Sequence, residues 1–480
     1  MDSILYWNEV AIEADRTTHT TGAPSEAGSR GPVGSSRALA IVHLAMHDAY
    51  FGINTGYEPY LGKKLPKPPP DADTDAAIAA AAHATLSALY PTQKAFFDAR
   101  HAAAGLVAGK PDVDGHTFGR KVAAAILALR KNDPGLGDDG YSSSAAPGHH
   151  RQDPDNSGQS FYAPFYGAAA RNFAVTIRHH LDDPPRPPSK EYDDAVRQVR
   201  SKGIRPDLTA TLPDDLFVNR RTPAETSIGI FWGYDGAKGL GTPPRLYNQI
   251  IRQIADAQGN DVAKNARLFA LANTAMGDAG VLAWSDKYFY DVWRPVLGIR
   301  EHDSSSGPTG VGDDVLDSGA DPQWLPLGAQ ATNTFDPAKI TKNFTPNFPA
   351  YPSGHATFGA AAFQTVRQFY KKGKYGPDDL AASLEFVSDE LNGINADNTG
   401  TVRQRRVRSF PRGLWQMIEE NGLSRPFLGV HWLFDAFAVN DSGEIDLSQN
   451  IGGVRLGLDI ANDIAKNGLK ADAAACPDSD

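Results

Sequence analysis

Apolar residues recur along most of this chain every three or four positions, the spacing that gathers side chains on one face of an α-helix. One series runs from Ile4 through Trp7 and Val10 to Ala14, and another begins at Leu39. Alternating strand patterns are scarce and short. Further helices are predicted near 75–107, 115–131, 189–202, 243–257, 261–294, 353–372, 378–392, 412–423, 426–440 and 454–466.

Long segments rich in Gly, Pro, Ser and Asp separate these helices and predict ordered loops. They are 21–36, 62–73, 133–160, 303–322 and 441–450. We therefore predict a mainly α fold of two helical bundles, of the four-helix type, packed as one globular unit with long ordered loops. Residues 1–234 would form a structural N-terminal bundle. Residues 235–480 would form the bundle that carries the site, because cations clustered with histidine occur there.

Composition and charge narrow the classes of function. At 480 residues, with 41% hydrophobic and 22% charged residues, the chain has the composition of a soluble globular protein with a large core. Its net charge of -10 gives no overall positive field for nucleic acid or an anionic membrane. The single cysteine, Cys476, excludes an internal disulfide and a cysteine-built metal site. No signal peptide is visible at Met1–Ile4.

The first segment with candidate chemistry runs from Ser285 to Pro295. Lys287 and Arg294 are seven residues apart, so a helix would place both cations on one face. Pro295 disfavours α geometry at the residue before it, so Arg294 should stand at a helix end. A solvated charged face would show the same pair.

The second segment, Phe348 to His355, is a proline turn that enters the helix predicted over 353–372. A helix start offers free backbone N–H groups and a partial positive charge, and Gly354 lets an anion approach the backbone. Ser353 adds a hydroxyl donor. An ordinary capped helix is the alternative interpretation.

The third segment runs from Ser424 to Asp435. If Pro426 starts a helix, His431 and Asp435 lie four residues apart on one face, and the carboxylate would hold one imidazole nitrogen. The other nitrogen would remain for a ligand or for nucleophilic attack. A satisfied core histidine is the alternative.

Together the three segments supply one lysine, two arginines (Arg294 and Arg425), a Ser-Gly helix start and two histidines. This set matches the needs of a tetrahedral oxyanion, whose central atom His431 would bond directly.

Other histidines offer a competing hypothesis. His43 and His47 have the spacing of a zinc-binding helix, but the glutamate of that motif and a third ligand are missing, so packing is favoured. The pairs 149–150 and 179–180 lie in polar loops and are predicted to face solvent.

The order and spacing of these motifs resemble the superfamily of vanadium haloperoxidases and vanadate-inhibited acid phosphatases. The motifs are Lys287 with Arg294-Pro295, then Pro-Ser-Gly-His at 352–355, then Ser424-Arg425 with His431 and Asp435. Longer stretches, including 6–8, 16–20, 234–236, 241–245, 348–358, 451–454 and 468–470, resemble the vanadium-dependent chloroperoxidases of the fungal type.

The resemblance implies a role for each matching residue. His431 would ligate vanadium, and His355 would be the acid/base group. The vanadate oxygens would be held by Lys287, Arg294, Arg425, Ser353 and the N–H of Gly354. Asp235 would pair with Arg425, and Trp284, Phe348 and Pro346 would line the halide side. Asp435 as the partner of His431 is an inference from spacing alone.

The resemblance also implies the reaction. Vanadate, without haem, would use hydrogen peroxide to oxidise chloride or bromide to hypohalous acid, with an organic molecule as an optional acceptor. His355 would take a proton from peroxide, and Lys287 would polarise the activated oxygen. Phe348 favours chloride competence, since bromide-preferring members tend to have His at that position. Secretion is implied by resemblance alone, and a cytoplasmic location stays open.

Two rival functions remain at this stage. In the first, His431 attacks phosphorus and His355 protonates the leaving group of a phosphomonoester. In the second, the pocket only binds phosphate or vanadate, although simple binding would not require His355.

Overall fold

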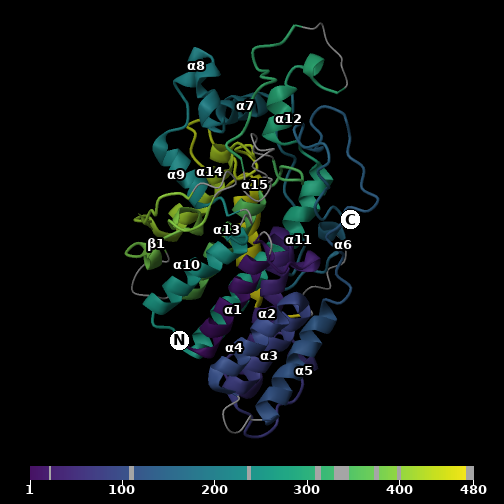
Figure 1. The fold of residues 1–480 in the computed structure, drawn as a ribbon, viewed down its shortest axis with the longest axis vertical. Coiled ribbons are helices and arrows are strands. Elements are labelled where there is room, and N and C mark those ends of the chain that lie inside the picture. Colours follow the sequence, from purple (N-terminus) through teal and green to yellow (C-terminus); the bar gives the residue numbers. More distant parts are fainter. Residues whose placement is uncertain are drawn as a thin grey trace.

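A computed structural model gives the structure of residues 1–20, 23–106, 113–234, 239–308, 315–328, 345–371, 378–396 and 402–471. The predicted mainly α fold is confirmed, as Figure 1 shows. The helices are α1 (Ser3–Thr18), α2 (Gly31–Ile53), α3 (Thr74–Leu89), α4 (Lys94–His101), α5 (Val113–Leu129), α6 (Tyr166–Ala169), α7 (Lys190–Lys202), α8 (Asp214–Phe217), α9 (Pro223–Phe231), α10 (Pro243–Ala257), α11 (Val262–Tyr290), α12 (Pro295–Arg300), α13 (Gly354–Tyr370), α14 (Gly413–Leu428) and α15 (Gly452–Asn467). Two short antiparallel strands, β1 (Glu385–Phe386) and β2 (Arg408–Ser409), pair Glu385 with Ser409.

Helix α11 is the element that connects the two halves of the chain. It starts where the Asp261 side chain accepts the Lys264 N–H at 2.8 Å, and its middle section is buried throughout. One side of α11 packs on α2, which itself packs on α3 and α5, and α11 also contacts α13 and α15. The main hydrophobic core of the described residues therefore includes residues from both halves. The division at residue 234 stays a prediction.

Small residues let α13 and α15 approach closely. A Cβ at Gly453 would lie 2.4 Å from the Ser353 carbonyl oxygen, and one at Gly457 would lie 2.4 Å from that of Thr357. Only glycine leaves room for this backbone contact. The contact fixes the depth at which the first turn of α13 is buried, and that turn carries the Ser-Gly-His motif.

Three of the predicted helices differ from the structure. The helix predicted over 75–107 is broken after Leu89, because Pro91 lacks an N–H and disfavours α geometry at Tyr90. The helix over 378–392 is wrong, since that segment forms short 3-10 turns and strand β1. The helix over 426–440 is also wrong, because Pro426 lies in the last turn of α14 instead of starting a new helix.

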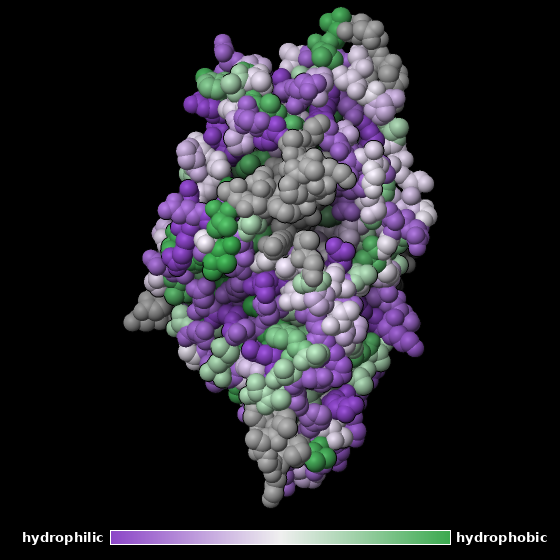
Figure 2. Space-filling view, viewed as in Figure 1, coloured by the Kyte–Doolittle hydropathy of each residue, from purple (hydrophilic) through white to green (hydrophobic). Residues whose placement is uncertain are grey.

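The surface is mixed in character. On the face drawn in Figure 2, hydrophobic residues are scattered among hydrophilic ones. Among the residues described, no helix combines the length and apolarity needed to cross a membrane.

Replacing Gly457 by Ala should destabilise the protein although Ala favours helices. The added methyl would collide with the Thr357 carbonyl, and such overpacking costs roughly 1–3 kcal/mol. Gly135→Ala is the matched control, because nothing lies within 4 Å of a Cβ at that position. Thermal unfolding of both variants tests this, and an unchanged Tm for Gly457→Ala would contradict the close contact.

Candidate active site

The two cations of the first motif are brought together by a helix break. Lys287 lies in the last turn of α11, which ends at Tyr290 because Asp291 adopts a left-handed conformation (φ 51°). Arg294 is extended (φ -80°, ψ 158°) and caps the start of α12, as Pro295 requires of the residue before it. The prediction that both cations share one helix face is therefore wrong, whereas the prediction that Arg294 stands at a helix end is confirmed.

The Lys287 ammonium is fully buried and holds the proline loop in front of α13. Its Nζ donates hydrogen bonds to the carbonyl oxygens of Pro349 (2.9 Å), Ala350 (3.0 Å) and Pro352. Burial lowers the pKa of Lys287 well below its ordinary value, and the neighbouring Arg294 charge acts in the same direction. This cation therefore ties the first motif to the second.

Arg294 joins all three motifs. Its Nε donates to the Phe348 carbonyl at 2.8 Å, and its Nη1 donates to the Val430 carbonyl at 2.7 Å. The same Nη1 lies 2.9 Å from Nε2 of His431. A guanidinium only donates hydrogen bonds, so Nε2 of His431 carries the lone pair.

A carboxylate holds the opposite side of the His431 ring. Nδ1 of His431 donates to Oδ2 of Asp435 at 2.8 Å, and this oxygen also accepts the Trp432 N–H at 2.9 Å. The predicted contact is confirmed, but on a different backbone. Gly429 ends α14 in a left-handed conformation (φ 76°), and both residues follow it in a series of turns.

Burial and charge set the protonation of this pair. Burial lowers the pKa of His431 well below its ordinary value, and the charges of Arg294, Lys287 and Arg425 lower it further. Burial also raises the pKa of Asp435 to about 7, against the opposing effect of Lys287 and Arg294. The imidazole is thus neutral, with its lone pair on Nε2, the nitrogen that faces Arg294.

The first turn of α13 has the predicted form. Ser353 is the N-cap, and its hydroxyl accepts the Ala356 N–H at 3.4 Å. Its own N–H donates to the Asp435 carbonyl at 2.8 Å, which places the turn beside the third motif. Gly354 lies against Trp284, where a Cβ would be 3.0 Å from the indole ring.

His355 is held as a neutral imidazole. Its Nε2 lies 2.7 Å from the carbonyl oxygen of Gly233, so this nitrogen carries the proton and Nδ1 carries the lone pair. Burial lowers its pKa well below the ordinary value, and the Arg425 charge is the next cause. Arg425 itself is buried in α14 and influences both histidines. Its predicted partner, Asp235, lies outside the described residues.

Aromatic rings form one side of the site. Trp284 and Phe348 lie with their centroids 4.9 Å apart, and Lys287 Nζ is 5.2 Å from the Phe348 centroid. Tyr162 lies 5.9 Å from Phe348 and 6.0 Å from Trp284, ring centroid to centroid. The predicted neighbour Pro346 is buried. Tyr162 had no sequence signal, because an isolated tyrosine after a loop does not reveal its long-range contacts.

The predictions for the loop histidines are partly wrong. His149 is 42% exposed and paired with Asp291, and His180 is 53% exposed and paired with Asp286. His179 is only 17% exposed and lies beside Asp463. His150 is completely buried, so it does not face solvent.

The zinc alternative is not supported. His43 uses Nδ1 on the Leu39 carbonyl (2.7 Å) and Nε2 on Asn8 (2.9 Å). His47 lies 2.9 Å from Asp48, and both histidines are buried. Within the described part of the chain, no group of three His, Cys, Asp or Glu side chains is arranged to hold a metal ion.

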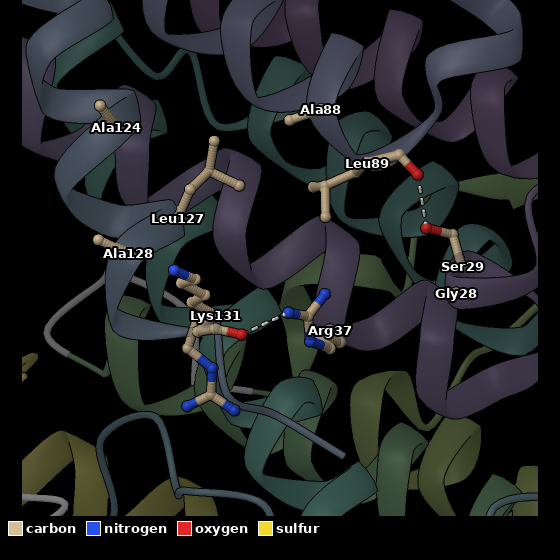
Figure 3. Close-up of a pocket in the computed structure, with 10 residues that line it drawn as sticks. Gly28, Ser29, Arg37, Ala88, Leu89, Ala124, Leu127, Ala128 and Lys131 are labelled. Atoms are coloured by element: carbon tan, nitrogen blue, oxygen red, sulfur yellow. Dashed lines mark hydrogen bonds between the residues drawn. The ribbon is translucent and has the colours of Figure 1, made fainter. Parts of the chain in front are cut away.

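A separate surface hollow lies among α2, α3 and α5, as Figure 3 shows. It has a volume of about 460 Å³ and is lined by residues such as Ser29, Arg37, Leu127 and Lys131. Arg37 is paired with Asp133 at 2.7 Å, and none of the motif residues lines this hollow.

The motif residues fit a multiply charged tetrahedral oxyanion. Three buried cations surround an imidazole whose lone pair is fixed by Asp435 behind it. The N-terminus of α13 adds the Ser353 hydroxyl and backbone N–H groups. Such a site binds the oxygens electrostatically and offers one nitrogen ligand to the central atom.

Comparisons with known proteins agree with this chemistry. Residues 1–159 match the model of the vanadium chloroperoxidase N-terminal domain, and residues 267–447 match that of the second helical-bundle domain of the same enzyme. The vanadium chloroperoxidase of Curvularia inaequalis is 36% identical, over 97% of this chain and 90% of that protein.

Solved structures share the fold. A bacterial vanadium-dependent iodoperoxidase superposes with a TM-score of 0.66 at 19% identity, covering 96% of each chain. A bacterial vanadium-dependent chloroperoxidase in its holo form gives a TM-score of 0.60 at 16% identity, covering 94% of this chain and 95% of the other. With the family models matching in both halves and this relative aligned over nearly the full length, the chain belongs to the vanadium chloroperoxidase family, whose members are haloperoxidase enzymes.

Proposed function

We propose that this protein holds vanadate and uses hydrogen peroxide to oxidise chloride, and also bromide, to hypohalous acid. The observation that carries the proposal is the arrangement at His431. Its Nε2 lone pair lies among Arg294, Lys287 and Arg425, while Asp435 fixes Nδ1. When bound, vanadate would supply a Lewis-acidic centre that activates peroxide without a haem or a reductant.

Residues of all three motifs would hold the vanadate. Nε2 of His431 would be the vanadium ligand. The oxygens would be held by Lys287, Arg294, Arg425, the Ser353 hydroxyl and the Gly354 N–H. The Lys287 and Arg294 donors are hydrogen-bonded to carbonyl oxygens in this structure. Binding of vanadate would therefore redirect part of these hydrogen bonds to the anion.

His355 would accept the proton that peroxide releases. Its Nε2 proton is engaged by the Gly233 carbonyl, so Nδ1 is the basic atom. The lowered pKa of His355 keeps the ring unprotonated before peroxide arrives. The ring then holds this proton for return to the product.

The aromatic side suits a halide. Trp284 and Phe348 present apolar rings there, while Lys287 and Arg294 lie close to the Phe348 ring. A partly dehydrated halide beside two cations would be attracted to the site and poorly stabilised by solvent. The apolar Phe348 supports chloride as a substrate.

The same His431–Asp435 pair would also suit attack on a phosphomonoester in the vanadium-free protein. The full-length similarity to a chloroperoxidase supports halide oxidation as the main activity. A pocket that only binds an anion would not need His355 and its fixed tautomer.

Metal-free protein should gain halide-oxidising activity when vanadate is added. With chloride or bromide and peroxide, we expect the rate to rise at least about 100-fold, because the Lewis acid is supplied only then. Excess phosphate should compete with vanadate for the same donors. Absence of vanadate-dependent oxidation of both halides would refute the function, and hydrolysis of a phosphomonoester alone would favour the phosphatase alternative.

His431→Ala and His355→Ala should separate binding from turnover. Loss of the direct ligand should weaken vanadate binding at least about 100-fold. Loss of the base should leave the vanadate Kd within a small factor but lower kcat by about 10²–10⁴-fold. Titration calorimetry and steady-state rates measure both. Unchanged affinity in His431→Ala, or unchanged turnover in His355→Ala, would remove the corresponding role.

Phe348→His should shift the preference towards bromide. A polar ring would hydrate the halide side and penalise the more strongly hydrated chloride, so the ratio of kcat/KM for bromide over chloride should rise by about tenfold, roughly 1.4 kcal/mol. Phe289→His is the control, because Phe289 is 77% exposed near the end of α11. An equal ratio in both variants would show that Phe348 does not select the halide.

A further inference from the structure

His150 is a buried imidazole that none of the assigned roles uses. Its relative exposure is 0%, yet neither Nδ1 nor Nε2 has a hydrogen-bond partner within the described residues. A buried polar group without a partner is unfavourable and calls for a specific explanation. The other buried histidines of the N-terminal half, His43 and His47, both have partners for their rings.

The backbone places His150 beside the first cationic motif. Its N–H donates to the Asp291 carbonyl at 3.0 Å, and the Trp293 N–H donates to the Gly148 carbonyl at 3.0 Å. An isolated antiparallel bridge between His149 and Val292 continues this pairing. The loop that carries His150 is therefore hydrogen-bonded along the short segment that separates Lys287 from Arg294.

The imidazole also belongs to the aromatic side of the site. Its ring meets Phe161 edge-on, with centroids 5.7 Å apart. The next residue, Tyr162, contacts both Phe348 and Trp284, and its N–H donates to the Asn347 carbonyl at 3.0 Å. The His150 ring therefore packs on the segment that carries Tyr162 into the aromatic side of the site.

His150 is close enough to two cations of the site for their charges to act on its ring. Burial, followed by the charges of Arg294, Lys287 and Arg151, lowers its pKa well below the ordinary value. The ring is neutral and keeps one N–H donor, close to two cations that attract an anion.

On the basis of the proposed haloperoxidase function, we propose that His150 binds the halide substrate and donates its ring N–H to the ion beside Phe348 and the Lys287–Arg294 pair. The geometry favours a halide over a vanadate oxygen, because the His150 ring packs on Phe161, and the next residue, Tyr162, contacts the Trp284 and Phe348 rings of the aromatic side. A monatomic anion would satisfy the N–H without displacing the carbonyl contacts of Lys287.

Kinetics of His150→Ala and His150→Gln test this role, with His149→Ala as the control. The exposed His149 has the same side chain one position earlier. We expect His150→Ala to raise the halide KM by about tenfold, with the KM for peroxide and the vanadate Kd unchanged, as loss of one hydrogen bond to an anion predicts. His150→Gln keeps a side-chain N–H and should recover part of the loss. An unchanged halide KM, or a weakened vanadate Kd instead, would overturn the proposal.

A binding measurement makes the test independent of turnover. In protein labelled with ¹³C-histidine, the ring signal of His150 is identified by its loss in His150→Gln. Bromide should shift this signal and leave that of His149 in place, in the vanadium-free or the vanadate-loaded protein. No bromide-dependent shift in either form would overturn the role of His150. If bromide shifts the His150 signal but the protein oxidises no halide, the proposed function is refuted and the halide site at His150 still stands.

Discussion

The contacts of one buried side chain, Arg294, hold the site together. Its guanidinium reaches the Phe348 carbonyl, the Val430 carbonyl and the His431 ring, which belong to segments far apart in the sequence. A planar group with five donors in a fixed arrangement can make such divergent contacts, which the single ammonium of a lysine could not reproduce. Removing it would leave buried carbonyls without donors and the imidazole without its neighbour.

The site depends equally on the carbonyl oxygens that surround its buried cations. Lys287 directs its three protons to the carbonyls of the loop before α13, so the loop and the cation stabilise each other. Burial keeps His355 and His431 neutral, and the surrounding charges act in the same direction. A bound oxyanion would complement this positive region. The same charges that add to the lowering of the pKa of these histidines would attract the proposed oxyanion.

Backbone packing provides the rigidity for these interactions. Gly453 and Gly457 bring α15 against the backbone of α13, and Gly354 brings α13 against Trp284. The start of α13 is thus enclosed between a helix and the aromatic side, next to Asp435. The helices of the N-terminal half contribute through α2, which packs on α11 and supports the helix that carries Lys287. The motif residues belong to the C-terminal half of the chain, whereas Tyr162 and the Gly233 carbonyl reach the site from the N-terminal half.

The sequence by itself determined the helical class, the three motifs, the Ser353 cap and the extended Arg294, because helix periodicity, capping and the effect of proline are local properties. It also determined that His431 and Asp435 are partners, although the helix assumed for them does not exist. Only the tertiary structure decided that Lys287 and Arg294 meet across a helix break, that Tyr162 joins the aromatic side and that His150 is buried. The last two features depend on contacts between residues more than 100 positions apart, as between His150 and Asp291. Such contacts leave no periodic signal in the chain, because they arise from the packing of whole helices and loops.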